Sequence, residues 1–378
     1  MSDRIVRHRL SVFLRILIVL AVIAGIAAIF WIQQKRRNYT DYEVTSTVKR
    51  DTSTNATSVL LGDRILSYSN DGANCCDLKG KTVWNETFEM QNPILAVSHS
   101  MAAIADYDGG QIYVVDKEES LGEITTNMPI REISVSDDGV VAAILDDSKV
   151  TWIYLYSAQG DTLAYFKTTM SQSGYPLSVS ISPNSTLVAV SYLQSGSGKV
   201  STGIAFFNFG DVGQNEVDNY MSGYNYDDTV VPDVQFMNNQ TAFAVADNRL
   251  MFYEGSQKPV SKSETLLDAQ VQSVYYNDQY VGLVTYDTSG TNKYMLTVYD
   301  ASGTVKFRKG FNTEYRNIVM TGGNIYIYGD TQCLIYNLFG TQKFAGTLNQ
   351  DISLIVPGNS ISKMAIVSQN SISELKLK

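Results

Sequence analysis

The chain has 378 residues, with 29 basic and 38 acidic side chains and a formal net charge of −9. The first 37 residues carry seven of the Lys and Arg side chains against one acid, which leaves a net charge of −15 on the remainder. An acidic body of this kind repels polyanions, so the composition disfavours nucleic acid as a partner.

An apolar segment near the N-terminus predicts one transmembrane helix. Residues 16–32 form an uninterrupted apolar run of seventeen, which extends to residue 10 if Arg15 reaches the lipid headgroups. We therefore expect a basic tail over residues 1–9 and a membrane-spanning helix over residues 10–33. A cleaved signal peptide is the alternative, but the apolar residues that continue after the small residues 24–27 favour an uncleaved anchor.

The charges that flank this helix bear on its orientation. Four Arg residues precede the run and three basic residues follow it, so the positive-inside rule only slightly favours a cytoplasmic N-terminus. The acidic domain that follows is rich in Ser, Thr, Asn and Tyr, which is compatible with a location outside the membrane. We expect an extracytoplasmic domain in the cell envelope, with a cytoplasmic domain on the same tether as the alternative.

The rest of the chain is built from repeats of about forty residues. Residues 34–42 look like a linker, and residues 43–49 alternate like a strand that stands apart from the first repeat. The clearest repeat has four apolar strands separated by Asp, Gly and Ser turns. Its strands are Ile130–Val135, Val140–Leu145, Val150–Tyr156 and Thr162–Lys167.

Seven such units and a remnant predict an all-β fold, a β-propeller over residues 43–378. The units lie near residues 56–88, 93–127, 130–168, 176–220, 232–266, 270–311 and 315–348. The remnant, residues 351–377, offers three strands, and the strand at 43–49 would be its fourth. Eight blades result, with no open sheet edge between the first and the last. A seven-bladed ring is the fallback if residues 43–49 are linker.

The first strand of each blade should line the central channel. Ile133, Val135, Val179 and Ile181 alternate along two of these strands and are expected to be largely buried. Most units also keep a glycine in the turn between the third and fourth strands, where a tight hairpin needs a positive φ. The second unit lacks this glycine.

These turns carry a resemblance to known propellers. The segment from Cys76 to Trp84, CDLKGKTVW, resembles the repeat of quinoprotein-type propellers, in which the turn leads into a strand with a docking Trp. Ser136–Gly139 and Ser182–Ser185 resemble turns of WD40-like and TolB-like repeats. The whole chain also resembles a family of single-span, propeller-bearing bacterial membrane proteins without assigned function. The resemblance implies a fold and leaves the activity open.

The residues that could carry catalysis or hold a cofactor are few. Cys75 and Cys76 are adjacent in a predicted strand, so their side chains should point to opposite faces, and we expect no quinone, metal or other cofactor. His99 is the one histidine outside the basic tail, and we expect it to be a surface loop residue. Asp137-Asp138 and Asp146-Asp147 are expected in hairpin turns, where Asp bonds to its own backbone.

The candidate binding residues lie in what the pattern predicts to be the longest irregular stretch, Asp218–Pro232. This stretch places Tyr220, Tyr224 and Tyr226 beside Asp227 and Asp228. Rigid aromatic side chains with carboxylate and amide neighbours can stack on a sugar ring or anchor a protein. An ordinary connector between blades is the alternative interpretation.

These observations lead to one functional hypothesis and one rival. We expect a membrane-anchored binding platform without enzymatic activity, whose partner is a protein or an envelope polysaccharide. Strand directions place the tight turns on the face from which the chain leaves for the membrane, so the partner should bind the opposite, membrane-distal face around blades four to six. The rival is a carbohydrate-active or other envelope enzyme that uses acidic side chains.

Overall fold

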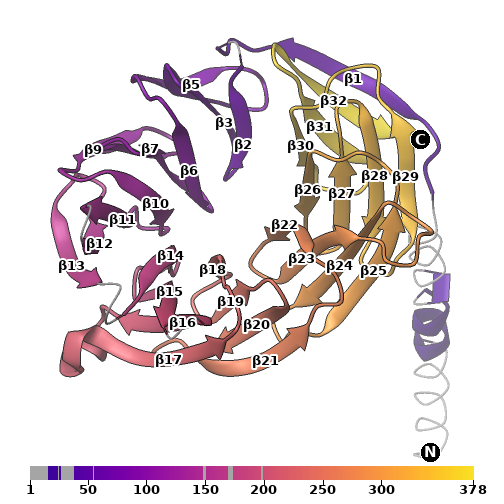
Figure 1. Ribbon diagram of the computed structural model, residues 1–378. Coiled ribbons are helices and arrows are strands. Elements are labelled where there is room, and N and C mark those ends of the chain that lie inside the picture. The colour runs from indigo at the N-terminus through magenta and orange to yellow at the C-terminus, as the bar shows by residue number, and fades with distance from the viewer. Residues whose placement is uncertain are drawn as a thin grey trace, which may run out of the picture.

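A computed structural model describes residues 16–23, 25–26, 38–53, 55–147, 150–168, 173–196 and 199–378. The described residues form eight four-stranded antiparallel sheets, arranged as the blades of a ring (Figure 1). The eight-bladed prediction is therefore confirmed, and the seven-bladed fallback is wrong.

The first four blades follow one another along the chain. Blade one contains β2 (Thr57–Leu61), β3 (Arg64–Ser69), β4 (Gly72–Cys76) and β5 (Thr82–Thr87), and blade two contains β6 (Pro93–Ser98), β7 (Met101–Asp106), β8 (Gln111–Asp116) and β9 (Ser120–Thr125). Blade three contains β10 (Ile130–Val135), β11 (Val141–Asp147), β12 (Val150–Tyr156) and β13 (Thr162–Thr168). Blade four contains β14 (Tyr175–Ile181), β15 (Leu187–Gly196), β16 (Lys199–Asn208) and β17 (Tyr220–Asp227), with the short 3-10 helices η1 (Gly213–Asn215) and η2 (Val217–Asn219) before β17.

The remaining blades complete the ring. Blade five contains β18 (Asp233–Phe236), β19 (Thr241–Val245), β20 (Arg249–Glu254) and β21 (Val260–Leu266), and blade six contains β22 (Val271–Tyr276), β23 (Tyr280–Tyr286), β24 (Tyr294–Asp300) and β25 (Val305–Phe311). Blade seven contains β26 (Asn317–Met320), β27 (Asn324–Tyr328), β28 (Gln332–Asn337) and β29 (Gln342–Thr347). Blade eight contains β30 (Leu354–Pro357), β31 (Lys363–Val367), β32 (Ser371–Leu377) and β1 (Tyr42–Lys49).

The two ends of the propeller pair with each other in blade eight. β1 lies antiparallel to β32, in a register that runs from Tyr42 opposite Leu377 to Lys49 opposite Ser371. The residues just before β1 are docked as well, because the backbone N–H of Tyr39 donates to the carbonyl of Lys343. The predicted closing strand is thus confirmed and begins one residue earlier than expected.

Glycines set the turn between the third and fourth strands in blades one, three, six and seven, whereas Gly210 of blade four has no positive φ and Gly255 of blade five has a φ of 149°. Gly80, Gly160, Gly303 and Gly340 have φ between 76° and 96°, and each donates its N–H to the carbonyl of the residue three positions earlier. This left-handed backbone favours glycine because a Cβ would strain it. In blade two the side chain of Asp116 instead accepts from the N–H groups of Glu118 and Glu119, which closes a turn that needs no glycine.

The hydrophobic core lies between neighbouring blades. Ile133, Val135, Val179 and Ile181 are at most 8% exposed, as predicted. The inner strands of blades three, four and five are also linked through serines, because the hydroxyl of Ser134 accepts from the N–H of Ile181 and that of Ser180 accepts from the N–H of Phe236.

The structure differs from the sequence-based predictions at two segments, and a third prediction lies mostly outside the described residues. The sequence predicts an irregular Asp218–Pro232, but most of this stretch is the eight-residue strand β17, which pairs with the long strand β16. Asp146 and Asp147 are the last residues of β11 rather than part of a turn, and Asp146 pairs there with Arg131.

Among the described residues no helix is long and apolar enough to cross a membrane. Much of the expected span, residues 10–33, lies outside the described residues.

Candidate functional site

A cleft of about 960 Å³ opens between the outer strands of blades three and four. Its walls are the outer strands β12 and β13 on one side and β15 to β17 on the other. The aromatic and amide side chains that face it include Phe166, Tyr220, Gln194 and Asn225. Cavities of this size accommodate small molecules or several units of a polymer.

Small residues on blade four create this space. Gly203 on β16 lies opposite Asn225, and Ala205 lies opposite Gly223 on β17, so this side of the blade has little side-chain volume. Phe166 and Phe207 close the floor, with ring centroids 4.7 Å apart. The sheets are therefore packed at the floor of the cleft and separated above it.

A β-bulge directs Tyr220 into the cleft. The register of β16 and β17 shifts between Phe206 and Phe207, so Tyr220 pairs with Phe207 instead of continuing the alternation from Ser222. Its ring packs edge-on against Phe207 at 6.0 Å, and its hydroxyl lies over Gly223, where an added Cβ would approach it to 2.4 Å. Tyr220 is nonetheless 48% exposed, so its ring remains available to a ligand.

The other predicted tyrosines are engaged with blade five. The hydroxyl of Tyr224 donates to the carbonyl of Pro259 and accepts from the N–H of Ser261, although part of Tyr224 also lines the cleft. The hydroxyl of Tyr226 lies 2.6 Å from that of Tyr253, and burial raises the pKa of Tyr226. These contacts join blades four and five.

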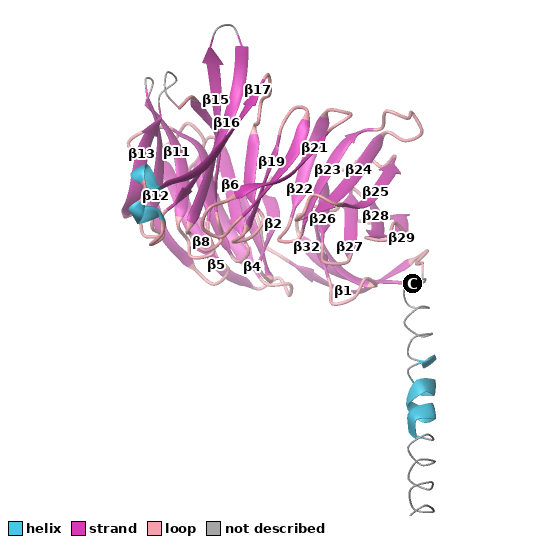
Figure 2. Cartoon of the chain, turned by 90° about the horizontal axis from the view of Figure 1, so that it is seen from below, coloured by secondary structure: helices cyan, strands magenta, loops and turns pink. Residues whose placement is uncertain are grey.

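The two predicted acids lie outside the cleft. Asp227 is the exposed last residue of β17, and Asp228 has a φ of 49° and lies 3.5 Å from the Nζ of Lys199. Both are near the far end of the β15–β16 hairpin, which extends beyond the neighbouring blades on one face of the ring (Figure 2). The five predicted residues therefore do not form one cluster.

An aromatic ladder lies on the opposite face of blade three, the face that packs toward blade two. The Trp152 ring lies 5.9 Å from that of Tyr165, and Tyr165 stacks on Tyr154 at 5.1 Å. Tyr156 continues the ladder at 5.4 Å from Tyr154. The alternation in TWIYLY could have indicated this feature, because residues two apart on a strand share a face.

The cleft is close to electrically neutral. Among its described lining residues only Lys167 and Asp218 carry a charge. Gln194 donates its amide to the carbonyl of Ser173, which fixes its orientation near Asn225. No group of three or more His, Cys, Asp or Glu residues suited to a metal ion occurs within the described part of the chain.

A second, smaller recess of about 310 Å³ lies in the central channel and contains Glu132. The Ser178 hydroxyl donates to Glu132, while Tyr276 donates to the Gln235 side chain, which in turn donates to Asp233. Burial raises the pKa of Glu132 to about 8, and the nearby Asp233 carboxylate contributes. Burial also raises the pKa of Asp233.

This environment predicts a pH-dependent stability. Between the ordinary pKa of 4.5 and about 8, folded Glu132 retains a proton that the unfolded chain has lost. The free energy of unfolding should therefore fall as pH rises through this window, and Glu132→Gln should reduce the fall. Denaturant titrations from pH 4.5 to 8 would measure it, with the exposed Glu89→Gln as control. Identical pH profiles for the Glu132 variant and the native chain would contradict the prediction.

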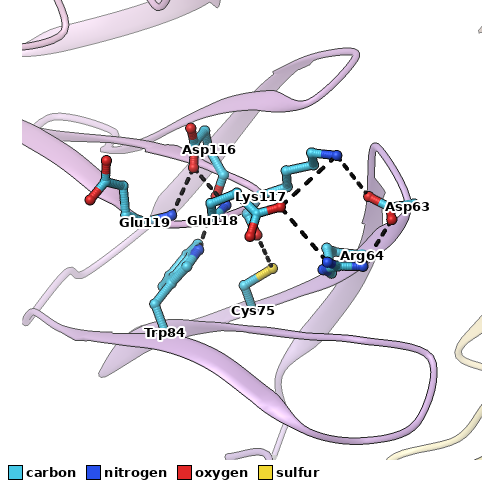
Figure 3. Close-up of polar contacts among 8 residues, drawn as sticks. All are labelled: Asp63, Arg64, Cys75, Trp84, Asp116, Lys117, Glu118 and Glu119. Atoms are coloured by element: carbon cyan, nitrogen blue, oxygen red, sulfur yellow. Dashed lines mark hydrogen bonds and ion pairs between the residues drawn. The ribbon is translucent and has the colours of Figure 1, made fainter.

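The cysteines and the docking Trp are packing residues between blades. The three cysteines are free and buried. Cys75 lies 3.6 Å from the Lys117 carbonyl of blade two, and Trp84 donates its indole N–H to the Asp116 carbonyl (Figure 3). Cys76 points the other way, into the cluster shared with blade eight, so the prediction of opposite faces is confirmed.

His99 lies in a surface turn directly after β6. Its Nδ1 is 2.8 Å from Asp137, and the Ser98 hydroxyl donates to the same carboxylate oxygen. The hydroxyl is thus bonded to the acid rather than to the imidazole. This geometry differs from a nucleophile bonded to its general base.

Comparison with known proteins identifies a family and a fold. A family model described as "Family of unknown function (DUF5711)" matches residues 35–377, and the chain belongs to that family. No curated protein matches the sequence. The structure is similar to BamB from Moraxella catarrhalis, with a TM-score of 0.52 and 11% identity over 89% of this chain and 100% of that chain. It is also similar to AztD from Citrobacter koseri, with a TM-score of 0.53 and 8% identity over 78% of this chain and 87% of that chain.

Proposed function

We propose that this member of the DUF5711 family is a membrane-anchored, extracytoplasmic binding protein without enzymatic activity. Residues 10–33 hold it in the cell membrane, and the propeller presents a binding surface to a protein or an envelope polymer. The observation that carries the proposal is the cleft between blades three and four, which combines the exposed ring of Tyr220 with amide groups in a near-neutral setting.

The topology supports a distal position for the blade-four hairpin. Tyr42 is the first residue of β1 and lies opposite Leu377. Residues 38–41 continue from this end of blade eight towards the N-terminus. Strands alternate in direction, so this end lies on the face of the tight third-to-fourth turns, while the β15–β16 hairpin projects from the other face (Figure 2). A tether at residue 38 then leaves the hairpin facing away from the bilayer.

Capture from solubilised membranes tests the binding function. The full chain should retain one stoichiometric partner, and Tyr220→Ala should reduce its recovery at least fivefold, because the ring lies in the cleft. Tyr286→Ala serves as control, since Tyr286 is a comparably exposed tyrosine, at 54%, on blade six. Equal recovery with the Tyr220 variant and the native chain would remove the cleft from the proposal.

Selective labelling tests the location. The three native cysteines are buried, whereas the side chain of Asp228 is exposed. A cysteine introduced by Asp228→Cys would therefore be the one accessible thiol among the described residues of the propeller. A membrane-impermeant maleimide should label this variant in intact cells. Labelling that occurs only after the cells are broken open would place the propeller in the cytoplasm.

The channel recess favours a second candidate function. Glu132 and Asp233 supply two carboxyl groups with raised pKa values, as a general acid in a carbohydrate-active enzyme requires. If this candidate is correct, hydrolysis of an envelope glycan should be lost in Glu132→Gln and retained in Tyr220→Ala. Hydrolysis that persists in Glu132→Gln would eliminate the candidate.

A further inference from the structure

We infer that the cleft between blades three and four binds an extended, basic segment of a partner protein, which adds as a fifth strand to the free edge of β13. The inference rests on the proposed binding function and gives its partner a chemical class. It depends on the strand edge at the cleft, on the space and polar groups beside that edge, and on the acids of the neighbouring insert.

The outermost strand of blade three has a free edge at the cleft. Among the described strands β13 pairs with β12 alone, so backbone N–H and C=O groups on its other side are left without a strand partner. Four consecutive residues, Tyr165–Thr168, border the cleft, although alternate side chains of a strand point to opposite faces. The cleft therefore reaches the backbone of this edge, where an extended chain can continue the sheet.

An added strand would have aromatic contacts on both of its faces. On the face toward blade four, Gly203 and Gly223 leave space for incoming side chains, and Tyr220 is 48% exposed there. On the face toward blade two, Tyr165 is 59% exposed and is held by its stack on Tyr154. The two exposed tyrosines thus lie on opposite faces, so they would contact alternate residues of one bound strand.

Polar groups in the cleft complement a peptide. Tyr192 lines the cleft and is 5% exposed, and its hydroxyl takes part in none of the hydrogen bonds among the described residues. A Cβ at Gly203 would lie 3.1 Å from the Oδ1 of Asn225 and 3.7 Å from the Nε2 of Gln194, so two amides converge on the same wall. Hydroxyl and amide groups donate and accept hydrogen bonds, as the peptide backbone does.

The charge beside the cleft selects a basic partner. The insert between β16 and β17 carries three exposed carboxylates, Asp211, Glu216 and Asp218, and none of the ion pairs among the described residues involves them. Asp218 lines the cleft, where Lys167 is the one cation among the described lining residues. The net charge after residue 37 is −15. Lys and Arg side chains would therefore be attracted to this side of the ring, and an acidic segment would be repelled.

Fluorescence anisotropy with labelled octapeptides tests this inference on the full chain in an uncharged detergent. The probes alternate Lys with Val, Leu, Ile or Tyr, and the matched control probes carry Glu in place of Lys. At least one Lys probe should bind with a Kd below about 1 mM, and at least about tenfold more tightly than its Glu counterpart. Probes N-methylated at every second residue report strand addition. One of the two methylation patterns should abolish binding and the other should retain it, because only alternate N–H groups of an added strand face the sheet.

Variants of the chain assign the binding to the cleft. Tyr165→Ala and Tyr220→Ala, on opposite faces, should each raise the Kd of the bound probe at least about threefold, and Asp218→Lys should raise it at least about fivefold. Tyr286→Ala and Asp71→Lys are the controls, because both residues are exposed and lie on blades six and one. All five side chains are exposed, so the variants should fold, and melting curves verify this.

The outcomes separate this inference from the proposed function. Strand addition at β13 is overturned if no Lys probe binds, if both methylation patterns leave the Kd unchanged, or if the control variants raise the Kd as much as the cleft variants. It is also overturned if the hexasaccharide of cellulose binds more tightly than every peptide, or if the chain forms a dimer that Tyr165→Ala dissociates. The occupant would then be a glycan or a second copy. The proposed function survives each of these results if Tyr220→Ala still lowers the recovery of the captured partner.

Discussion

A chain shortened to begin at Ala56 is expected to be far less stable than one that begins at Asn38. The shorter chain lacks β1, so seven residue pairs with β32 are lost and β32 becomes the outermost strand of a three-stranded blade. It also lacks Arg50, which bonds to Ser58 and Ser67 of blade one. A net contribution of about 1 kcal/mol per hydrogen bond gives a loss on the order of 5 kcal/mol. Its free edge should also promote aggregation.

Thermal unfolding and size-exclusion chromatography of the two chains would measure this effect. The expected fall in Tm is on the order of 10 °C. A matched control is Val44→Thr in the longer chain, which keeps the ladder and changes only a side chain that is 48% exposed. Equal Tm values and equal solubility for the two lengths would show that β1 contributes nothing to closure.

The second large effect is expected from Arg50→Met, since Arg50 fastens blade eight to blade one. Its guanidinium donates to the hydroxyls of Ser58 and Ser67 at 3.0 and 2.9 Å and to the carbonyl of Ser368 at 2.9 Å. Arg50 is 6% exposed, and burial lowers its pKa. None of the ion pairs among the described residues involves it, so these polar contacts offset the burial of its charge.

Removing this side chain leaves buried hydroxyls and carbonyls with fewer partners. The expected loss is on the order of 3–5 kcal/mol, as for other buried polar networks. Arg50→Lys should also be destabilising, because an ammonium cannot span both blades as the planar guanidinium does. Arg316→Met is the control: Arg316 is exposed and paired with Asp330, and its loss should change stability by less than about 0.5 kcal/mol. A similar small change at Arg50 would refute its role.

Much of the ring could be predicted from the sequence because each blade is a local unit. Apolar alternation recurs from blade to blade, and the glycine turns at Gly80, Gly160, Gly303 and Gly340 occupy the same place between the third and fourth strands. The closing strand could be inferred as well, since three strands at the C-terminus needed a fourth and residues 43–49 were left over. Local patterning therefore determined the blade count.

The cleft could not be predicted in the same way, because it depends on the packing of two blades. Tyr220 enters it through a bulge, and Gly203 and Gly223 open it by having no side chain. Neither feature has a local periodic signature. Tyr224 and Tyr226 illustrate the same limit: their spacing is that of a strand, and only the neighbouring blade shows that their hydroxyls are already bonded.

Pairing of β1 with β32 also has a consequence for biosynthesis. Tyr42 must wait for Leu377, which is synthesised about 335 residues later. At roughly 5–20 residues per second, the nascent chain spends roughly 17 to 70 seconds with its first strand unpaired. β1 is suited to this interval because its sequence, YEVTSTVK, is mostly polar and exposed even in the finished ring. A polar strand of this kind exposes little apolar surface while it waits, and the ring can close only after β32 has been synthesised.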